Sequence, residues 1–279
     1  MHGFAIRVGD TSLRLVEIKA MGFAMKLLCG TFVLAVFCCI GARAADVITF
    51  ETAPDGTTPI DDALLSSPYS IAGGTIRFFF DVNGDNRYDS AVDALPAFEV
   101  AGRDEHNAFA TAWDNSSDTP RPGYAAQLGS YFLRVAGAQA SSSLPPQLPG
   151  PFIAQCRTTQ NISGLSGEIW DIDGGSSGGT EQWRVEVLDN LGNVLSTEVS
   201  PLGVDESNSS LDGLPWTFSF SGLPRAAESL RLSFIGSKSN GAAVAFNNFS
   251  ITSVPEPSGL ILSTLALFAA AVMLRARSA

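Results

Sequence analysis

Hydrophobic and polar residues alternate with a period of two in several short segments of the chain. In the clearest segments, 183–187, 216–220 and 230–234, every second residue is tryptophan, phenylalanine, leucine or valine. Such a period places alternate side chains on opposite faces of a strand that has one buried face. Further strands are predicted at 47–51, 75–80, 98–101, 108–113, 131–135, 168–172, 194–199 and 244–252.

Turn residues separate many of these segments, and no helical period of any length precedes residue 258. Residues 189–193, with the sequence DNLGN, are typical of a hairpin loop in which glycine takes a positive φ. Eleven or so short strands in about 210 residues predict an all-β protein, namely a two-sheet β-sandwich of jelly-roll type. We read residues 138–151 as a loop and not as a linker, so that 45–254 form one domain.

The N-terminal 44 residues have the three parts of a secretory signal peptide. Lys26 precedes an apolar run at 27–40, and Ala42 and Ala44 form the small-residue site after which a signal peptidase would cut. Charged residues in 1–24 make an awkward leader, which suggests that translation starts at Met25; a long n-region is the alternative. Phe37 stands where a lipoprotein signal has a small residue, which argues against that class.

The C-terminal segment, 255–279, combines a proline neck, an apolar stretch and a basic end. Pro255 and Pro257 flank Glu256, the apolar stretch covers 260–274, and Arg275 and Arg277 follow it. The prolines favour an extended neck, and the arginines favour a cytoplasmic C-terminus. At about 1.5 Å per residue the apolar stretch is about 22 Å long, short for a bilayer core of about 30 Å.

This tail resembles the PEP-CTERM sorting signal of Gram-negative bacteria, with residues 255–257 as its motif. The resemblance implies recognition by an exosortase, a membrane helix, a location at the cell envelope or in the extracellular matrix, and an association with extracellular polysaccharide. A plain C-terminal membrane anchor is the alternative. Both readings place residues 45–254 outside the cytoplasm.

Charge and rare residues exclude several functions. The net charge is −11, and residues 45–254 alone hold 25 acidic and 10 basic residues, which argues against nucleic acid and favours divalent cations as partners. With only two histidines in the chain, a catalytic zinc centre is excluded. Cys156 is the single cysteine of 45–254, so this part has no internal disulfide; a buried core residue is favoured over a nucleophile there.

One loop, DVNGDNRYD, carries the pattern of a calcium site. Side-chain oxygens at alternate positions of a tight loop can converge on one hard cation, with a backbone carbonyl at the seventh position. The loop resembles those of the dockerin and EF-hand families, which implies calcium as a structural cofactor. The predicted ligands are Asp81, Asn83, Asp85, Arg87 through its carbonyl, and Asp89.

The loop departs from the family pattern at two positions. Asn86 stands where glycine makes the sharp turn, and Asn tolerates that conformation. Val92 stands at the twelfth position, where an acidic ligand is expected, and Asp93 follows one residue late as a weaker candidate. The alternative is an acidic surface turn closed by its own hydrogen bonds.

Two further polar groups are candidates. Glu168, Asp171, Asp173 and Glu181 surround a glycine-rich segment, and we expect a solvated rim there in preference to an ion site. By resemblance to jelly-roll carbohydrate-binding modules, neighbouring first and last strands would bring Glu51 close to Asn247 and Asn248, with a structural calcium between them.

The sequence favours a non-enzymatic function. It has no nucleophile elbow, phosphate-binding loop or HExxH motif, and a histidine base is available only at His106. The expectation is therefore an exported matrix component, with a calcium-dependent carbohydrate-binding module and a secreted glycan-active enzyme as alternatives. Binding predicts exposed aromatic residues on one sheet face, whereas an enzyme predicts a cleft with opposed carboxylates and a raised pKa.

Overall fold

The computed structural model describes residues 45–102, 109, 119–135, 148–174, 179–204, 211–238 and 244–254. The predicted signal cleavage site at Ala42 and Ala44, the motif at 255–257 and the basic end at Arg275 and Arg277 lie outside these residues. None of the described helices is long and apolar enough to cross a membrane.

Twelve strands and one short helix form the regular structure of the described residues. The elements are β1 (Asp46–Ile48), β2 (Tyr69–Ile71), β3 (Gly74–Phe80), β4 (Pro96–Val100), α2 (Ala125–Leu128), β5 (Tyr131–Val135), β6 (Phe152–Thr158), β7 (Asn161–Trp170), β8 (Trp183–Asp189), β9 (Val194–Val199), β10 (Pro215–Ser221), β11 (Ala227–Phe234) and β12 (Ala245–Val254).

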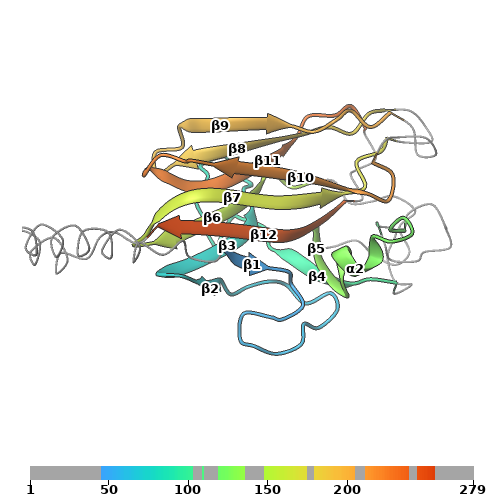
Figure 1. Cartoon of the computed structure of the whole chain (residues 1–279), viewed down its shortest axis with the longest axis horizontal. Helices are drawn as coiled ribbons and strands as arrows, with labels where there is room; N and C mark the ends of the chain where they lie inside the picture. The colour runs from blue at the N-terminus through green and yellow to red at the C-terminus, as the bar shows by residue number, and fades with distance from the viewer. Residues whose placement is uncertain are drawn as a thin grey trace, which may run out of the picture. The chain divides into compact units, whose positions relative to one another are not determined.

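The strands form two antiparallel sheets, which we call sheet A and sheet B (Figure 1). Sheet A has the order β10-β7-β12-β5-β4, and β1 also pairs with β12. Sheet B has the order β2-β3-β6-β11-β8-β9. The prediction of an all-β, two-sheet β-sandwich is therefore confirmed, and from β5 to β8 the chain passes from one sheet to the other at each step.

The core between the sheets is rich in aromatic rings. Phe152 of β6 stacks on Phe246 of β12, with ring centroids 4.3 Å apart and an interplanar angle of 4°. Phe78 and Phe249 contact the same group from opposite sheets, 5.0 Å apart in an edge-on arrangement. Because each ring buries a large apolar area, these contacts between sheets are a main source of stability.

A second, smaller apolar cluster covers part of the outer face of sheet A. Trp170, Phe132 and Ala245 point away from the main core and pack against Leu128 of α2 and Phe109. Sheet A is therefore buried on both faces where β7, β12 and β5 meet α2. A different segment covers the outer face of sheet B.

Several strands differ from the sequence prediction. The pattern indicated 168–172, whereas β7 begins at Asn161 and ends at Trp170, and β6 and β2 were missed. In β6 the first five residues are all buried, so no polar alternation marks it. A side chain at Gly167 of β7 would lie 2.7 Å from the Phe218 ring, which explains a glycine inside this strand.

Other local predictions have mixed outcomes. The hairpin at 189–193 is confirmed, with Gly192 at φ 82°. The helix α2 was not predicted, and it is a single turn. The strand predicted at 47–51 is β1, which ends earlier because Phe50 has φ 61°. The strand predicted at 108–113 lies, apart from residue 109, outside the described residues.

Replacing Phe152 by alanine should destabilise the fold strongly, because it removes the ring that stacks on Phe246 and leaves a cavity. We expect a loss of about 3–5 kcal/mol in the free energy of unfolding, measured by chemical denaturation. Leu191→Ala, at a hairpin residue that is 77% exposed, is the control and should change stability by less than about 0.5 kcal/mol. Equal stability of Phe152→Ala and the wild type would contradict the assigned core.

Candidate functional site

The predicted calcium loop lies over the outer face of sheet B. Tyr88 packs edge-on against Phe79, whose side chain points away from the core, with ring centroids 5.5 Å apart. The Arg77 guanidinium lies 4.3 Å above the Tyr88 ring, and Arg231 Nη1 donates to Asn86 Oδ1 at 3.2 Å. These contacts fix the loop on strands β3 and β11.

The side chains of the loop bind its own backbone amides. Asp81 Oδ1 accepts from the Gly84 amide and Oδ2 accepts from the Asn86 amide, both at 2.8 Å. Asn83 Oδ1 accepts from the Asp85 amide at 3.1 Å. Asn86 has φ 59°, so asparagine does adopt the left-handed conformation needed at this position.

Asp93 closes the loop, although it stands one residue late in the calcium pattern. Its Oδ1 accepts from the Val82 amide at 3.1 Å, and its Oδ2 accepts from the Asp89 amide at 2.7 Å. The Arg87 amide donates to Asp85 Oδ1 at 2.7 Å. Within the described part of the chain, no three histidine, cysteine, aspartate or glutamate side chains gather closely enough to hold a metal. Calcium binding therefore stays a prediction.

Glu51, Asn247 and Asn248 meet at one backbone segment, residues 127–131. Glu51 Oε1 accepts from two amides there, at 2.7 and 3.1 Å. Asn247 Nδ2 and Asn248 Nδ2 donate to two carbonyl oxygens of this segment, at 2.6 and 2.9 Å. The pairing of β1 with β12 thus places the three side chains near each other, and whether calcium binds them stays a prediction.

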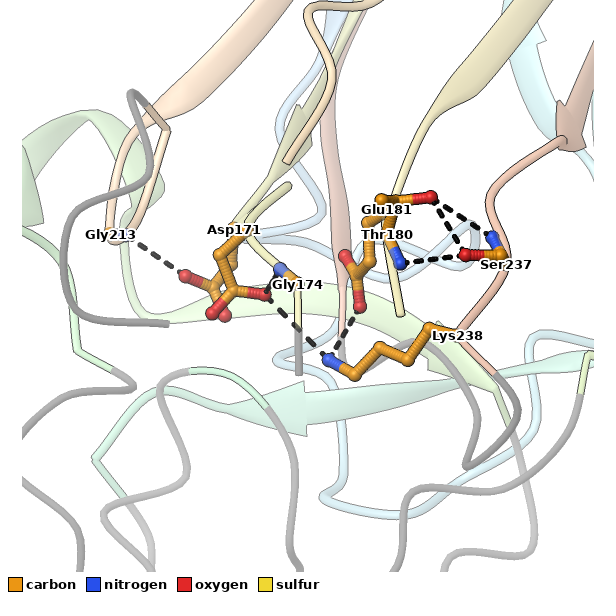
Figure 2. Close-up of polar contacts among 8 residues, drawn as sticks. Asp171, Gly174, Thr180, Glu181, Gly213, Ser237 and Lys238 are labelled. Atoms are coloured by element: carbon orange, nitrogen blue, oxygen red, sulfur yellow. Dashed lines mark hydrogen bonds and ion pairs between the residues drawn. The ribbon is translucent and has the colours of Figure 1, made fainter. Parts of the chain in front are cut away.

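The expectation of a solvated rim around Asp171, Asp173 and Glu181 is wrong. Their exposed fractions are 4%, 4% and 0%. The Nζ atom of Lys238 lies 2.7 Å from Glu181 Oε1 (Figure 2). It also lies 3.7 Å from Asp173 Oδ1. Lys238 was missed because it follows β11, far from the carboxylates in sequence. Glu168 lies elsewhere, on sheet A, where Trp170 Nε1 donates to it.

Burial shifts the titration of two glutamates. It raises the pKa of Glu181 to about 7 against the opposing effect of Lys238, and it raises the pKa of Glu99 to about 7 against Arg134. Burial also raises the pKa of the Cys156 thiol to about 12, which agrees with an inert core residue. His106 lies outside the described residues.

Two adjoining clefts have volumes of about 590 and 230 Å³, and the smaller one opens beside the 81–93 loop. They share Asn190 and Glu228 as lining residues. The larger cleft is lined by the β6–β7 connection and the β10–β11 connection, and the smaller one by the loop and the β8–β9 hairpin. We call them together the polar cleft; the polar residues used below are Asp85, Arg87, Gln155, Arg157, Asn190, Arg225 and Glu228.

Gln155 is the most deeply buried of these polar side chains. It lines the smaller cleft on the outer face of β6, it is 5% exposed, and its Oε1 has no hydrogen-bond partner among the described residues. A buried carbonyl oxygen without a donor is costly, and a ligand hydroxyl would satisfy it. The cleft also has negatively charged carboxylates and positively charged guanidinium groups, and it lies in a domain that is strongly acidic overall.

Aromatic residues do not form an open platform in the described part of the chain. Trp170 and Trp183 are fully buried, and Trp216 is half-buried. Tyr124 is 40% exposed, near α2 and not at the polar cleft. Trp113 lies outside the described residues.

Comparisons with known proteins give no family for the chain. No protein-family model and no curated protein matches it. Among solved structures, the CBM22-1 xylan-binding domain of Paenibacillus barcinonensis Xyn10C is similar over 77% of this chain and 99% of that domain, with 13% identity and a TM-score of 0.27. A likeness of this size does not indicate a ligand.

Calcium should raise the melting temperature of the protein if either predicted ion site is real, because a ligand of the folded state stabilises it. Asp85→Asn would abolish the rise if the ion binds in the 81–93 loop, and Glu51→Gln would abolish it if the ion binds at residues 127–131. The measurement is a thermal melt in millimolar calcium and in a chelator. Identical melts in both conditions would contradict calcium binding.

Proposed function

We propose that this chain is an exported glycan-binding β-sandwich protein that binds extracellular polysaccharide in its polar cleft. The observation that carries the proposal is the buried Oε1 atom of Gln155, which lines the cleft and has no donor within the part of the chain that the structure describes. The function is one of binding and retention at the cell envelope or in the matrix, and it requires no chemical step.

The chemistry of the cleft suits a carbohydrate. Sugar hydroxyls donate and accept hydrogen bonds, and amide, carboxylate and guanidinium groups can serve both needs. Asn190 and Glu228 lie where the two clefts adjoin, so an extended chain of sugar units could contact both. Arg157 and Arg225 line the larger cleft and could bind an acidic substituent.

Binding is favoured over glycoside hydrolysis by the location of the perturbed carboxyl groups. A hydrolase needs a general acid with a raised pKa facing a second carboxylate across the substrate. The described glutamates whose pKa is raised to about 7, Glu99 and Glu181, lie outside the polar cleft. Each is held by a cation, Arg134 or Lys238 respectively.

Export and sorting rest on the two ends of the sequence. The signal peptide would direct residues 45–254 out of the cytoplasm, and the tail would hold the protein in the membrane until an exosortase acts on it. A polysaccharide-binding sandwich delivered in this way would reach its ligand outside the cell. Calcium, if bound, would stabilise a loop beside the cleft.

Substitutions in the polar cleft should weaken binding to the host's extracellular polysaccharide. Gln155→Ala and Arg157→Ala each remove about one hydrogen bond, worth about 1 kcal/mol, so the affinity should fall about fivefold in isothermal titration calorimetry. The matched control is Thr217→Ala, at an exposed position of β10 on the other sheet. If the control and the cleft variants bind as the wild type does, the cleft is not the site.

Sorting can be tested on protein recovered from the cell surface. Mass spectrometry of its C-terminus should show a chain that ends before residue 279, because the tail would be removed on processing. Replacing Glu256 by alanine should leave the tail on. A surface protein that still ends at Ala279 would contradict processing by an exosortase.

A further inference from the structure

Lys238, Asp173 and Glu181 form a buried cluster. Figure 2 shows Lys238 pointing toward Glu181. Asp173 follows β7 of sheet A, Glu181 precedes β8 of sheet B, and Lys238 follows β11 of sheet B. The side chains of all three are at most 8% exposed. Lys238 Nζ contacts Glu181 Oε1 at 2.7 Å and lies 3.7 Å from Asp173 Oδ1.

Closely packed backbone surrounds these side chains. A Cβ atom on Gly203 would lie 1.9 Å from the Asp173 carbonyl oxygen, and one on Gly179 would lie 2.8 Å from Lys238 Cα. Thr180 and Ser237 add a hydrogen-bonded pair beside the cluster (Figure 2). Such packing holds the amine and the carboxylates in fixed positions and limits the access of water.

Several carboxylates act on the Lys238 ammonium in the cluster. Asp171 also acts electrostatically on Lys238, so the ammonium has three carboxylates around it. Asp171 Oδ1 accepts a hydrogen bond from the Gly213 amide. Glu181 Oε2 is buried and has no hydrogen-bond partner among the described residues. Burial alone would lower the pKa of Lys238, but the carboxylates, above all Glu181, outweigh it and the net shift is upward.

Glu181 is nevertheless suited to carry a proton, because burial raises its pKa to about 7. A proton that moves from Nζ to Oε1 along their hydrogen bond leaves a neutral amine beside a neutral acid. A low-dielectric site tolerates this neutral pair better than an exposed site would. The amine is then a nucleophile within reach of Asp173.

We propose that Lys238 and Asp173 form an intramolecular amide bond, with Glu181 as the catalytic residue that transfers the protons. The Nζ atom attacks Cγ of Asp173, the bond from Cγ to one carboxylate oxygen breaks, and that oxygen leaves as water. One ammonium and one carboxylate thus give one amide and one water molecule, so no oxidant or other reactant is needed.

The surroundings of Asp173 support its role as the electrophile. The Gly174 amide donates to its Oδ1, which would stabilise the negative oxygen of the tetrahedral intermediate. Glu181 accepts a proton from the attacking amine and delivers it to the departing oxygen. The bond would join the end of β7 in sheet A to the end of β11 in sheet B. An exported domain with the single cysteine Cys156 has no internal disulfide to provide such a link.

The test is a peptide map of the full chain after purification and denaturation. Trypsin should release peptide 158–184 joined to the peptide that begins at residue 232, with a mass lower by one water molecule than the sum of the two. Fragmentation should place the link between Asp173 and Lys238. Only unlinked peptides in the wild-type protein would overturn the proposal, as would a link at Glu181 in place of Asp173.

Variants separate the roles of the three residues. Asp173→Ala and Lys238→Arg should abolish the linked peptide, and Glu181→Gln should abolish it although both reacting side chains remain. The control is Glu99→Gln, which changes a buried carboxylate in another ion pair, with Arg134, and should leave the link intact. A linked peptide of unchanged yield in Glu181→Gln would overturn the catalytic role of Glu181. The map does not depend on glycan binding, so either proposal can fail alone.

Discussion

The contact between the aromatic side chains of the two sheets is the constraint on which the rest of the structure depends. Phe152 and Phe246 come from opposite sheets and stack almost parallel, and Phe78 and Phe249 pack around them. Because this layer fixes the distance and orientation of the sheets, it also fixes which side chains point outward. The loop at 81–93 and the smaller part of the polar cleft occupy one of those outward faces.

The outer faces of the two sheets have different partners. Sheet A is covered by a small apolar cluster and by α2, with polar side chains that bind the backbone at 127–131. Sheet B is covered by the 81–93 loop, beside which the smaller cleft opens. The closely packed segments around Lys238 hold charged side chains away from water. The polar cleft and the buried charged cluster are thus lined by different residues of the fold.

The sequence predicted the fold class well because several strands, such as β8, β10 and β11, alternate apolar and polar residues. It missed β6, whose residues from Phe152 to Cys156 are buried on both faces, and it shortened β7, where Gly167 makes room for aromatic rings. The hairpin at 189–193 was predictable because its signal is local.

The candidate sites were harder to predict, because they depend on residues distant in sequence. The oxygen-rich loop was visible as a motif, but its position against Tyr88 and Arg77 depends on tertiary packing. Asp173 and Glu181 were expected to be solvated, since nothing near them in sequence indicates that Lys238 joins them. Gln155 belongs to no sequence motif, and the structure alone shows that its Oε1 is buried with no partner among the residues it describes.

The central claim is that the polar cleft binds extracellular polysaccharide. The most direct measurement is hydrogen–deuterium exchange of the purified protein with and without the host's polysaccharide. The account predicts slower exchange at residues 155–161, 190–192 and 225–228, which line the cleft, and unchanged exchange in β10. Unchanged exchange throughout the chain at saturating polysaccharide, or protection confined to β10, would contradict it.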